Sequence, residues 1–432
     1  MRKRSSLIAA ATRSQQMGAA ASTTASRLAF RPAGVAPLPP GAAPPLVVVT
    51  WNILCNKYAG SQFSYCPPQF LAWQYRKQRC VETLLELRPD IVCLQEVERP
   101  FFENELEPLF QQHGYEALYY SRRRRPHDPP DAPEEGISLL YRTARLEKQA
   151  SKAAQLGKGV ARGMTGKFWG AVRARDDGVL LALLRDRVTR RTLLAGCTHL
   201  YWDPRFPDIK QPGTPVSSLI QMKSKLAGMQ AAQAALVCRA ATSFLRQQRL
   251  VHDATLQRDA AAIPLVIAGD FNSLPFKRRS DAFDTVRPGE TLISGAYTVL
   301  ASKEGIDSSH PDHPSRRSLV GGGAAAQALA TLRLSSDPFL LQSASVAAWG
   351  REPPVTNKTD SFAGCLDYVW LSRRHWAVSA ALPLPYRFDP SRPGQQTAVN
   401  DPSDVRDLPP LPSETIPSDH LPLAFKLHLV PT

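Results

Sequence analysis

The stretch 263–275 places two polar residues directly after an apolar run. Residues 265–268 carry no charge and do not alternate with polar residues, which is typical of a strand buried on both faces. The run ends at Gly269, and Asp270 and Asn272 follow with one residue between them. Open α/β proteins bind ligands at the ends of such strands. The pair is therefore a candidate for catalysis, although an ordinary strand-to-loop turn can have the same sequence.

The same arrangement recurs along the chain. Asn52 follows the apolar run 46–50, and Glu96 follows the run 90–94 after one intervening residue. His199 follows a strand expected over 192–197. A strand-end histidine is often a hydrogen-bonded structural residue, whereas a glutamate at the end of a buried run is unfavourable in a core. We therefore expect Glu96 to line a cleft, and the repetition indicates a shared site.

The remaining elements must position these residues. Apolar, β-branched runs predict further strands over 136–142, 179–184 and 365–371, and a last strand ending near Leu429. Apolar residues at helical spacing predict helices over about 69–87, 101–114 and 218–249. Strands that alternate with helices indicate an α/β fold.

Length and composition limit the possible classes of protein. The 432 residues suffice for one large domain or two smaller ones, and 43% hydrophobic with 21% charged residues is typical of globular proteins. No apolar run of about 18 residues predicts a membrane span. The formal charge of +15 suits a polyanionic partner or a solvated basic surface. Seven cysteines without a Cys-x-x-Cys pair predict buried, reduced thiols.

Residues 1–45 differ in composition from the rest of the chain. Six basic residues are spread among Ala, Ser and Thr, and no Asp or Glu occurs before Glu82. This composition is typical of an organelle transit peptide and predicts a mitochondrial protein. A basic tail without a targeting role, on a cytoplasmic protein, is the alternative. The prolines of 32–45 predict a stiff linker, after which a domain covers residues 46–430.

Three regions are expected to be insertions in this domain, near 120–135, 303–350 and 390–412. The first contains four consecutive arginines, 122–125, in a loop rich in Pro and Asp. We interpret them as solvated loop charges, with contact to phosphate as the alternative.

Six short motifs occur in the order found in the endonuclease/exonuclease/phosphatase superfamily, which the chain resembles. They are Trp51-Asn52-Ile53-Leu54, Leu94-Gln95-Glu96-Val97, Thr198-His199-Leu200, Gly269-Asp270-Phe271-Asn272, Leu366-Asp367-Tyr368 and Ser418-Asp419-His420. Further segments are similar to the deadenylase branch: the carbon-catabolite-repressor deadenylases, nocturnin, the angel proteins and the mitochondrial 2′-phosphodiesterase. They are Tyr65-Cys66-Pro67, residues 73–77, Trp202-Asp203-Pro204 and residues 356–362. The resemblance implies a four-layered α/β sandwich, in which two mixed sheets pack face to face with helices outside.

The resemblance also implies a divalent cation, Mg²⁺, with Mn²⁺ as the alternative. Glu96 would be its ligand, with Asn52 beside it and Asp419 near a second metal. Hard cations prefer carboxylate oxygen and keep several waters, so one or two carboxylates suffice.

Catalytic roles follow from the same resemblance. Asp270 would orient or deprotonate the attacking water, and Asn272 would hold the phosphate or the base. His420, oriented by Asp367, would stabilise the phosphoryl oxygens, and His199 would complete the phosphate pocket. In the deadenylases a proline and a phenylalanine sandwich the terminal base, and they match Pro204 and Phe362.

Two departures from the family pattern bear on substrate choice. Cys197 stands where an asparagine is usual before Thr-His-Leu, and Ile137-Ser138 replaces the usual cysteine. We expect a 3′-to-5′ exoribonuclease that removes adenylate residues from RNA. The alternatives are 2′,5′-oligoadenylate cleavage, a nocturnin-like dinucleotide phosphatase, and a non-catalytic RNA-binding module, which the intact residue set disfavours. No leucine-rich repeats precede the domain, so docking to a deadenylase complex through them is not implied.

Overall fold

Two mixed β-sheets form the centre of the protein. The computed structural model describes residues 28–33, 38–123, 131–202, 216–277, 286–316, 323–387 and 405–431. The first sheet has seven strands in the order β1 (Arg31–Pro32), β16 (Trp376–Ala381), β17 (Leu423–Leu429), β2 (Leu46–Asn52), β3 (Ile91–Glu98), β5 (Glu135–Arg142) and β4 (Tyr115–Ser121). The second has six, in the order β12 (Leu341–Ser343), β15 (Asp367–Ser372), β9 (Leu265–Asp270), β8 (Thr192–His199), β7 (Gly178–Asp186) and β6 (Leu146–Gln155).

Each sheet has a parallel pair at its centre. β2 and β3 run parallel, as do β8 and β9, and the named strands on either side pair antiparallel. Apolar side chains from the inner faces of both sheets, such as Val48, Leu139, Ala195 and Val266, form one core cluster between them. The central strands are therefore buried on both faces, as their uninterrupted apolar sequences predict.

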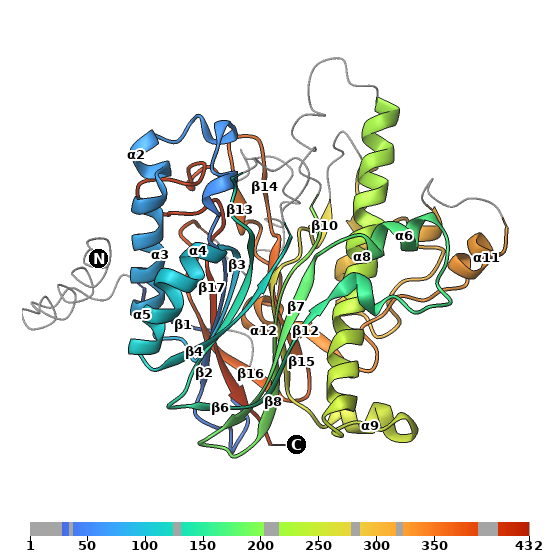
Figure 1. Ribbon diagram of the computed structural model, residues 1–432, viewed down its shortest axis with the longest axis horizontal. Helices are drawn as coiled ribbons and strands as arrows, with labels where there is room; N and C mark the ends of the chain where they lie inside the picture. Colours follow the sequence, from blue (N-terminus) through green and yellow to red (C-terminus); the bar gives the residue numbers. More distant parts are fainter. Residues whose placement is uncertain are drawn as a thin grey trace, which may run out of the picture.

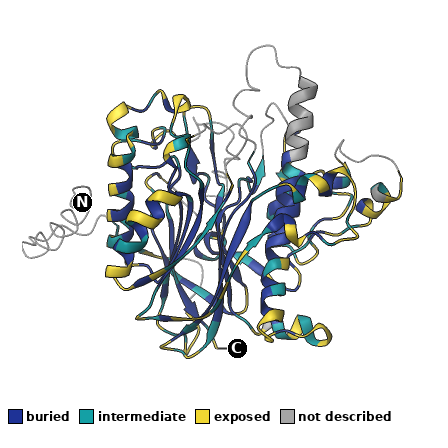
Figure 2. Ribbon diagram, in the orientation of Figure 1, coloured by how far each residue is buried: buried dark blue, intermediate teal, exposed yellow. Residues whose placement is uncertain are grey.

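Helices cover the outer faces (Figure 1). α3 (Trp73–Leu87), α4 (Arg99–Phe101) and α5 (Glu107–Gln112) supply residues to the core cluster on the first sheet. The long α8 (Val216–Gln247), with α6 (Lys167–Arg173) and α10 (Gly295–Ala301), does the same on the second sheet. The predicted four-layered α/β sandwich is confirmed. Figure 2 shows the strands buried between these helical layers.

Several predicted elements differ in detail. The expected helix over 69–87 consists of α2 (Pro68–Leu71) and α3, separated by Ala72, whose φ of −56° and ψ of 130° are not helical. Part of the expected N-terminal linker belongs to the folded domain, since β1 pairs with β16 and the Ala43 amide donates to Leu429 O at 3.0 Å. The region 303–350 contributes the edge strand β12 and helix α12 (Ala344–Trp349) to the sandwich.

The structure bears on two predictions from composition, which concern the cysteines and membrane-spanning helices. All seven cysteines are free and buried, as predicted. Among the described helices, none combines the length and apolar composition that crossing a bilayer requires.

Candidate active site

The polar residues at the strand ends meet where the central strands of both sheets terminate. In the second sheet His199 lies opposite Asp270 in the register, and Asp270 lies opposite Asp367. Asn52, at the end of β2, links the two sheets. Its Nδ2 donates to Glu96 Oε1 and to Asp270 Oδ2, both at 3.0 Å.

Unusual backbone conformations present these side chains. Gly269 has φ +156°, and a Cβ at that position would lie 1.9 Å from Thr198 O on the neighbouring strand. Only glycine therefore fits directly before Asp270. Glu96 (φ 58°) interrupts the pairing of β3 with β5, and Asn272 also has positive φ (49°). Left-handed residues other than glycine are unfavourable and cluster at functional sites.

Asp270 is the centre of the site. Its side chain is 1% exposed, and its Oδ1 accepts a hydrogen bond from the backbone N–H of Asn272 at 2.8 Å. The Nε2 atoms of His199 and His420 lie 3.5 Å and 3.7 Å from its Oδ2. Burial, and to a lesser degree the charge of Asp367, raises the pKa of Asp270 to about 7, against the lowering effect of His420 and Asn52. A carboxylate with this pKa is suited to accept a proton near neutral pH.

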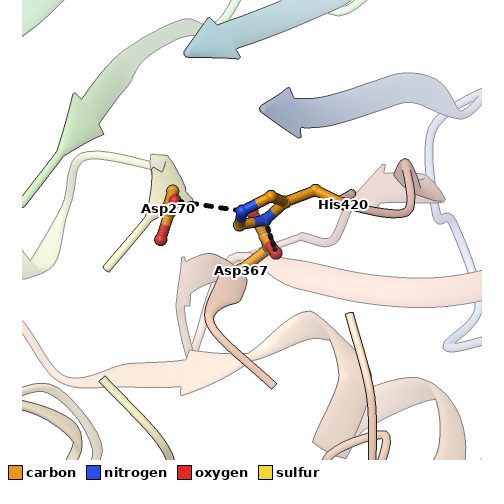
Figure 3. Close-up of side chains that lie close together, drawn as sticks. All are labelled: Asp270, Asp367 and His420. Carbon is orange, nitrogen blue, oxygen red and sulfur yellow. Dashed lines mark hydrogen bonds and ion pairs between the residues drawn. The ribbon is translucent and has the colours of Figure 1, made fainter. Parts of the chain in front are cut away.

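His420 forms a dyad with Asp367 (Figure 3). Its Nδ1 lies 2.8 Å from Asp367 Oδ2, and its Nε2 is directed at Asp270. Burial lowers the pKa of His420, but the carboxylates around it, Asp367 first, outweigh burial and raise the pKa well above its usual value. Trp51 Nε1 donates to His420 O at 2.9 Å and fixes the backbone. The imidazole is therefore held in one orientation, and its surroundings favour the cationic form.

Two groups of residues offer ligands to a cation. Among the described residues, Asp270, Asp367 and His420 bring possible ligand atoms within 4.8 Å of one another. The hydrogen bond between Asp367 and His420 already occupies one atom of each. Glu96 is half-buried, and burial, with the charges of Asp419 and Glu135, raises its pKa. A bound cation would relieve this excess of negative charge, so the residues around Glu96 fit a divalent metal.

The other predicted residues lie around this centre. Asn52 Oδ1 accepts the Leu54 amide at 3.0 Å, so its amide nitrogen faces the two carboxylates. Asn272 Nδ2 donates to Leu200 O at 3.0 Å. Asp419 Oδ2 accepts Asn357 Nδ2 at 3.0 Å.

Phe362 lies in the turn between β13 (Asn357–Lys358) and β14 (Ala363–Gly364), which hydrogen bonds between Thr359 and Phe362 close. Asn357 also forms a bridge to His420, so this hairpin borders the dyad. Pro204 lies outside the described residues, and its predicted partnership with Phe362 stays a prediction.

The residues that depart from the family pattern, Cys197 and Ile137-Ser138, lie in the interior of the protein. Cys197 is fully buried between the sheets and accepts a hydrogen bond from Gln95 Nε2 at 3.5 Å. Ile137 and Ser138 are buried as well, and Ser138 Oγ donates to Leu118 O at 3.0 Å. Both departures therefore lie in the interior, behind the site.

Sequence reasoning missed Arg122. It is 6% exposed and lies beside Glu135 and Asp177, with its Nη2 2.7 Å from His199 Nδ1, so its interpretation as a solvated loop charge was wrong. Burial lowers the pKa of Arg122, but the two carboxylates outweigh burial and raise it. Arg122 directly follows β4. A polar residue after a predicted strand was the pattern that indicated the other site residues, and it would also have indicated Arg122 had β4 been predicted.

Comparison with known proteins agrees with this geometry. The profile of the endonuclease/exonuclease/phosphatase family matches residues 49–420. The CCR4-Not complex 3′-5′-exoribonuclease subunit Ccr4 of Neosartorya fischeri is 25% identical over 393 residues, which cover 88% of this chain and 46% of that protein. The chain thus spans about half the length of the curated relatives it matches.

Two solved structures share the fold. ANGEL2, a 2′,3′-cyclic phosphatase in complex with adenosine-2′,3′-vanadate, has a TM-score of 0.60 at 18% identity and covers 93% of this chain and 99% of its own. The human nocturnin catalytic domain with bound sulfate has a TM-score of 0.52 at 19% identity and covers 90% and 95%. With the family profile matched over most of its length and the six motifs gathered at one site, this chain belongs to the endonuclease/exonuclease/phosphatase family.

Proposed function

We propose that the protein is a metal-dependent phosphodiesterase that removes adenylate residues from the 3′ ends of RNA. The observation that carries the proposal is Asp270, a buried carboxylate with a pKa of about 7, held between two histidines and beside the Asn52 amide. The name of the Ccr4 relatives, 3′-5′-exoribonuclease subunit, supports the choice of substrate.

In this reaction a water attacks the terminal phosphorus, and the bond from phosphorus to the 3′ oxygen of the preceding nucleotide breaks. Asp270 takes a proton from the attacking water and later releases it to solvent, and the 3′ oxygen takes a proton from solvent as it leaves as a hydroxyl. The products are adenosine 5′-monophosphate and an RNA shorter by one residue. The cationic His420 neutralises charge that grows on the phosphoryl oxygens, with Asp367 fixing its ring.

Glu96 would hold the metal, which we propose to be Mg²⁺, with Asp419 nearby. When bound, the metal would supply positive charge to the phosphate. The carboxylate of Glu96 is fixed for this role by Asn52 Nδ2 and by the Cys55 amide, which donates to Oε2 at 3.1 Å. Two donors hold the carboxylate in place, which favours one defined geometry for the cation.

The half-buried ring of Phe362 is proposed to stack on the terminal base. Gly364 lies under this ring, since a Cβ there would come 2.8 Å from Phe362 Cζ. The absence of a side chain at Gly364 therefore allows the ring to approach the backbone of the hairpin closely. Mitochondrial location, from the acid-free N-terminus, is part of the proposal and is tested by the distribution of a reporter fused to residues 1–45.

A substrate panel tests the function. Purified protein with Mg²⁺ is incubated with a 5′-labelled oligoadenylate, a 2′,5′-linked triadenylate, a phosphorylated dinucleotide, and an oligoadenylate that ends in a 2′,3′-cyclic phosphate. We expect stepwise shortening of the first substrate at the highest kcat/KM. Glu96→Ala should abolish the reaction in a folded protein, and Glu103→Ala, which removes an exposed carboxylate outside the site, should not.

Each of the other outcomes of this panel would change the proposed substrate or the proposed metal ligand. Preference for the 2′,5′ linkage or the dinucleotide would replace the substrate and keep the chemistry. Opening of the cyclic phosphate alone would make the protein a phosphatase like ANGEL2. Near-normal turnover by Glu96→Ala would refute the metal assignment.

A further inference from the structure

Arg122 and His199 form a buried contact beside the proposed catalytic carboxylate. The side chains are 6% and 5% exposed, and Arg122 Nη2 lies 2.7 Å from His199 Nδ1. On the other side of the ring, His199 Nε2 lies 3.5 Å from Asp270 Oδ2. The imidazole is thus placed between a guanidinium and a carboxylate.

The chemistry of the guanidinium determines the protonation of the ring. Arginine carries only hydrogen-bond donors and stays protonated in proteins. A hydrogen bond from Arg122 therefore requires a lone pair on His199 Nδ1. The ring is then neutral, with its proton on Nε2, which faces Asp270.

Other buried groups hold Arg122 in this position. Its Nη2 also donates to Glu135 Oε2 at 3.1 Å, and its Nη1 donates to Asp177 Oδ1 at 3.2 Å. Asp177 Oδ2 accepts Gln233 Nε2 at 2.8 Å, and Gln233 Oε1 accepts the Tyr201 amide at 2.7 Å. This network joins α8 to the chain just after His199, so the guanidinium and the imidazole are fixed relative to each other.

The surrounding charges would otherwise favour a cationic ring. Asp270 faces His199 from β9, and Glu135 and Asp177 lie behind the guanidinium. Three carboxylates near one imidazole would stabilise its protonated form. The Arg122 contact opposes this by occupying Nδ1 with a donor.

We infer that Arg122 is a positioning residue that keeps His199 neutral, with Nε2–H on the side of Asp270, where the reacting phosphate would bind. The inference rests on the proposed function for the identity of the reaction, and on the contacts of Arg122 for the state of the ring. A neutral Nε2–H can donate to a phosphoryl oxygen throughout the neutral pH range. His199 therefore stabilises charge without contributing an ionisation of its own.

Three variants test the role of Arg122, with a small generic phosphodiester as substrate so that adenylate specificity does not matter. Arg122→Met removes every donor, and we expect kcat/KM to fall about 10- to 100-fold. In Arg122→Met the lone pair on His199 Nδ1 loses its donor, so ¹⁵N NMR should show a proton on Nδ1, which the wild type lacks. Arg122→Lys keeps a cationic donor and should restore most of the activity and the unprotonated Nδ1.

Arg123→Met is the matched control. Arg123 is the next residue, its side chain is 76% exposed, and it pairs with Asp176 outside the site, so its loss should leave kcat/KM unchanged. Equal losses of kcat/KM in the Met and Lys variants, with His199 Nδ1 unprotonated in both, would overturn the inference and make Arg122 a packing residue.

Folding and turnover are controlled separately. Arg122→Met leaves two buried carboxylates without their partner, so Arg122→Met with Asp177→Asn, which removes one of them, serves if the single variant does not fold. If no substrate is hydrolysed, ¹⁵N NMR of the histidine rings still reports the protonation of His199. A proton on Nδ1 in the wild-type protein would refute the inference, whatever the substrate.

Discussion

The two histidines on either side of Asp270 lie at similar distances from it but have opposite surroundings. His420 is bonded through Nδ1 to a carboxylate, Asp367, and His199 is bonded through Nδ1 to a guanidinium, Arg122. The first partner favours a cationic ring, and the second requires a neutral one. The residue behind the ring thus sets the role of each histidine. One supplies charge and the other supplies a fixed hydrogen bond.

The largest effect is expected from disrupting the dyad of His420 and Asp367. Asp367→Asn replaces the anion behind the ring with a neutral amide, which removes the main support for the cation and weakens its orientation. We expect kcat to fall roughly 10³- to 10⁴-fold, as when a histidine loses its carboxylate partner in a catalytic triad. Steady-state kinetics on oligoadenylate measures the loss. A drop of less than tenfold would show that the charge of His420 is unimportant.

The pH dependence of kcat/KM reports on Asp270, which lies between the two histidines. Because burial raises the pKa of Asp270 to about 7, the wild-type kcat/KM should rise about tenfold per pH unit below that value and level off above it. A bound cation favours the ionised carboxylate and should move this limb to lower pH. The carboxylates around His420 raise its pKa well above its usual value, so His420 should lose its proton only at higher pH than an ordinary histidine. A rate that falls as pH rises from 5 to 8 would exclude Asp270 as the base.

Recognition of the terminal base should depend on the hairpin beside His420 and not on the residues around His199. The hairpin that carries Phe362 is bridged to His420 through Asn357. Loss of a stacking ring should weaken binding by about 1 to 3 kcal/mol, so Phe362→Ala should lower kcat/KM on oligoadenylate about five- to a hundredfold. A generic phosphodiester without a base should be cut as before. Equal losses on both substrates would make Phe362 a packing residue that supports the dyad.

The smallest expected effect is on stability and concerns the carboxylate between the two histidines. Between about pH 4 and pH 7 the folded protein retains a proton on Asp270 that the unfolded chain has released. The free energy of unfolding of the wild type should therefore fall as pH rises through this window. Asp270→Asn lacks this fall and should be about 1 to 3 kcal/mol more stable than wild type at pH 8 without metal.

Chemical denaturation at pH 5 and pH 8 in the presence of a chelator measures this difference. Asp253→Asn, which alters a side chain that is 85% exposed, is the control and should follow the wild type. An Asp270→Asn protein that is less stable than wild type at both values would show that the carboxylate stabilises the fold.

The sequence was most informative where strands are buried on both faces. Uninterrupted apolar runs marked β2, β3, β8 and β9, and the polar residues after them proved to meet at one site. The edge strand β6 was missed because one side of it is solvated, so its sequence, Leu-Glu-Lys-Gln-Ala-Ser-Lys-Ala-Ala-Gln, contains no apolar run.

Arg122 shows why part of the site was not predictable. The missed strand β4 places Arg122 at a strand end, and four arginines in succession resemble a solvated loop. Only the fold brings Glu135 and Asp177 to its guanidinium. Contacts between residues 55 and 77 positions apart in the chain leave no local pattern in the sequence.

The most direct test of the contrast between the two histidines is ¹⁵N NMR of histidine-labelled wild-type protein between pH 6 and pH 9, with resonances assigned through His199→Gln and His420→Gln. We predict that His199 is neutral throughout with its proton on Nε2, and that His420 keeps protons on both nitrogens to higher pH than an ordinary histidine. A His199 that titrates between pH 6 and pH 7, or a His420 that is neutral at pH 7, would contradict this prediction.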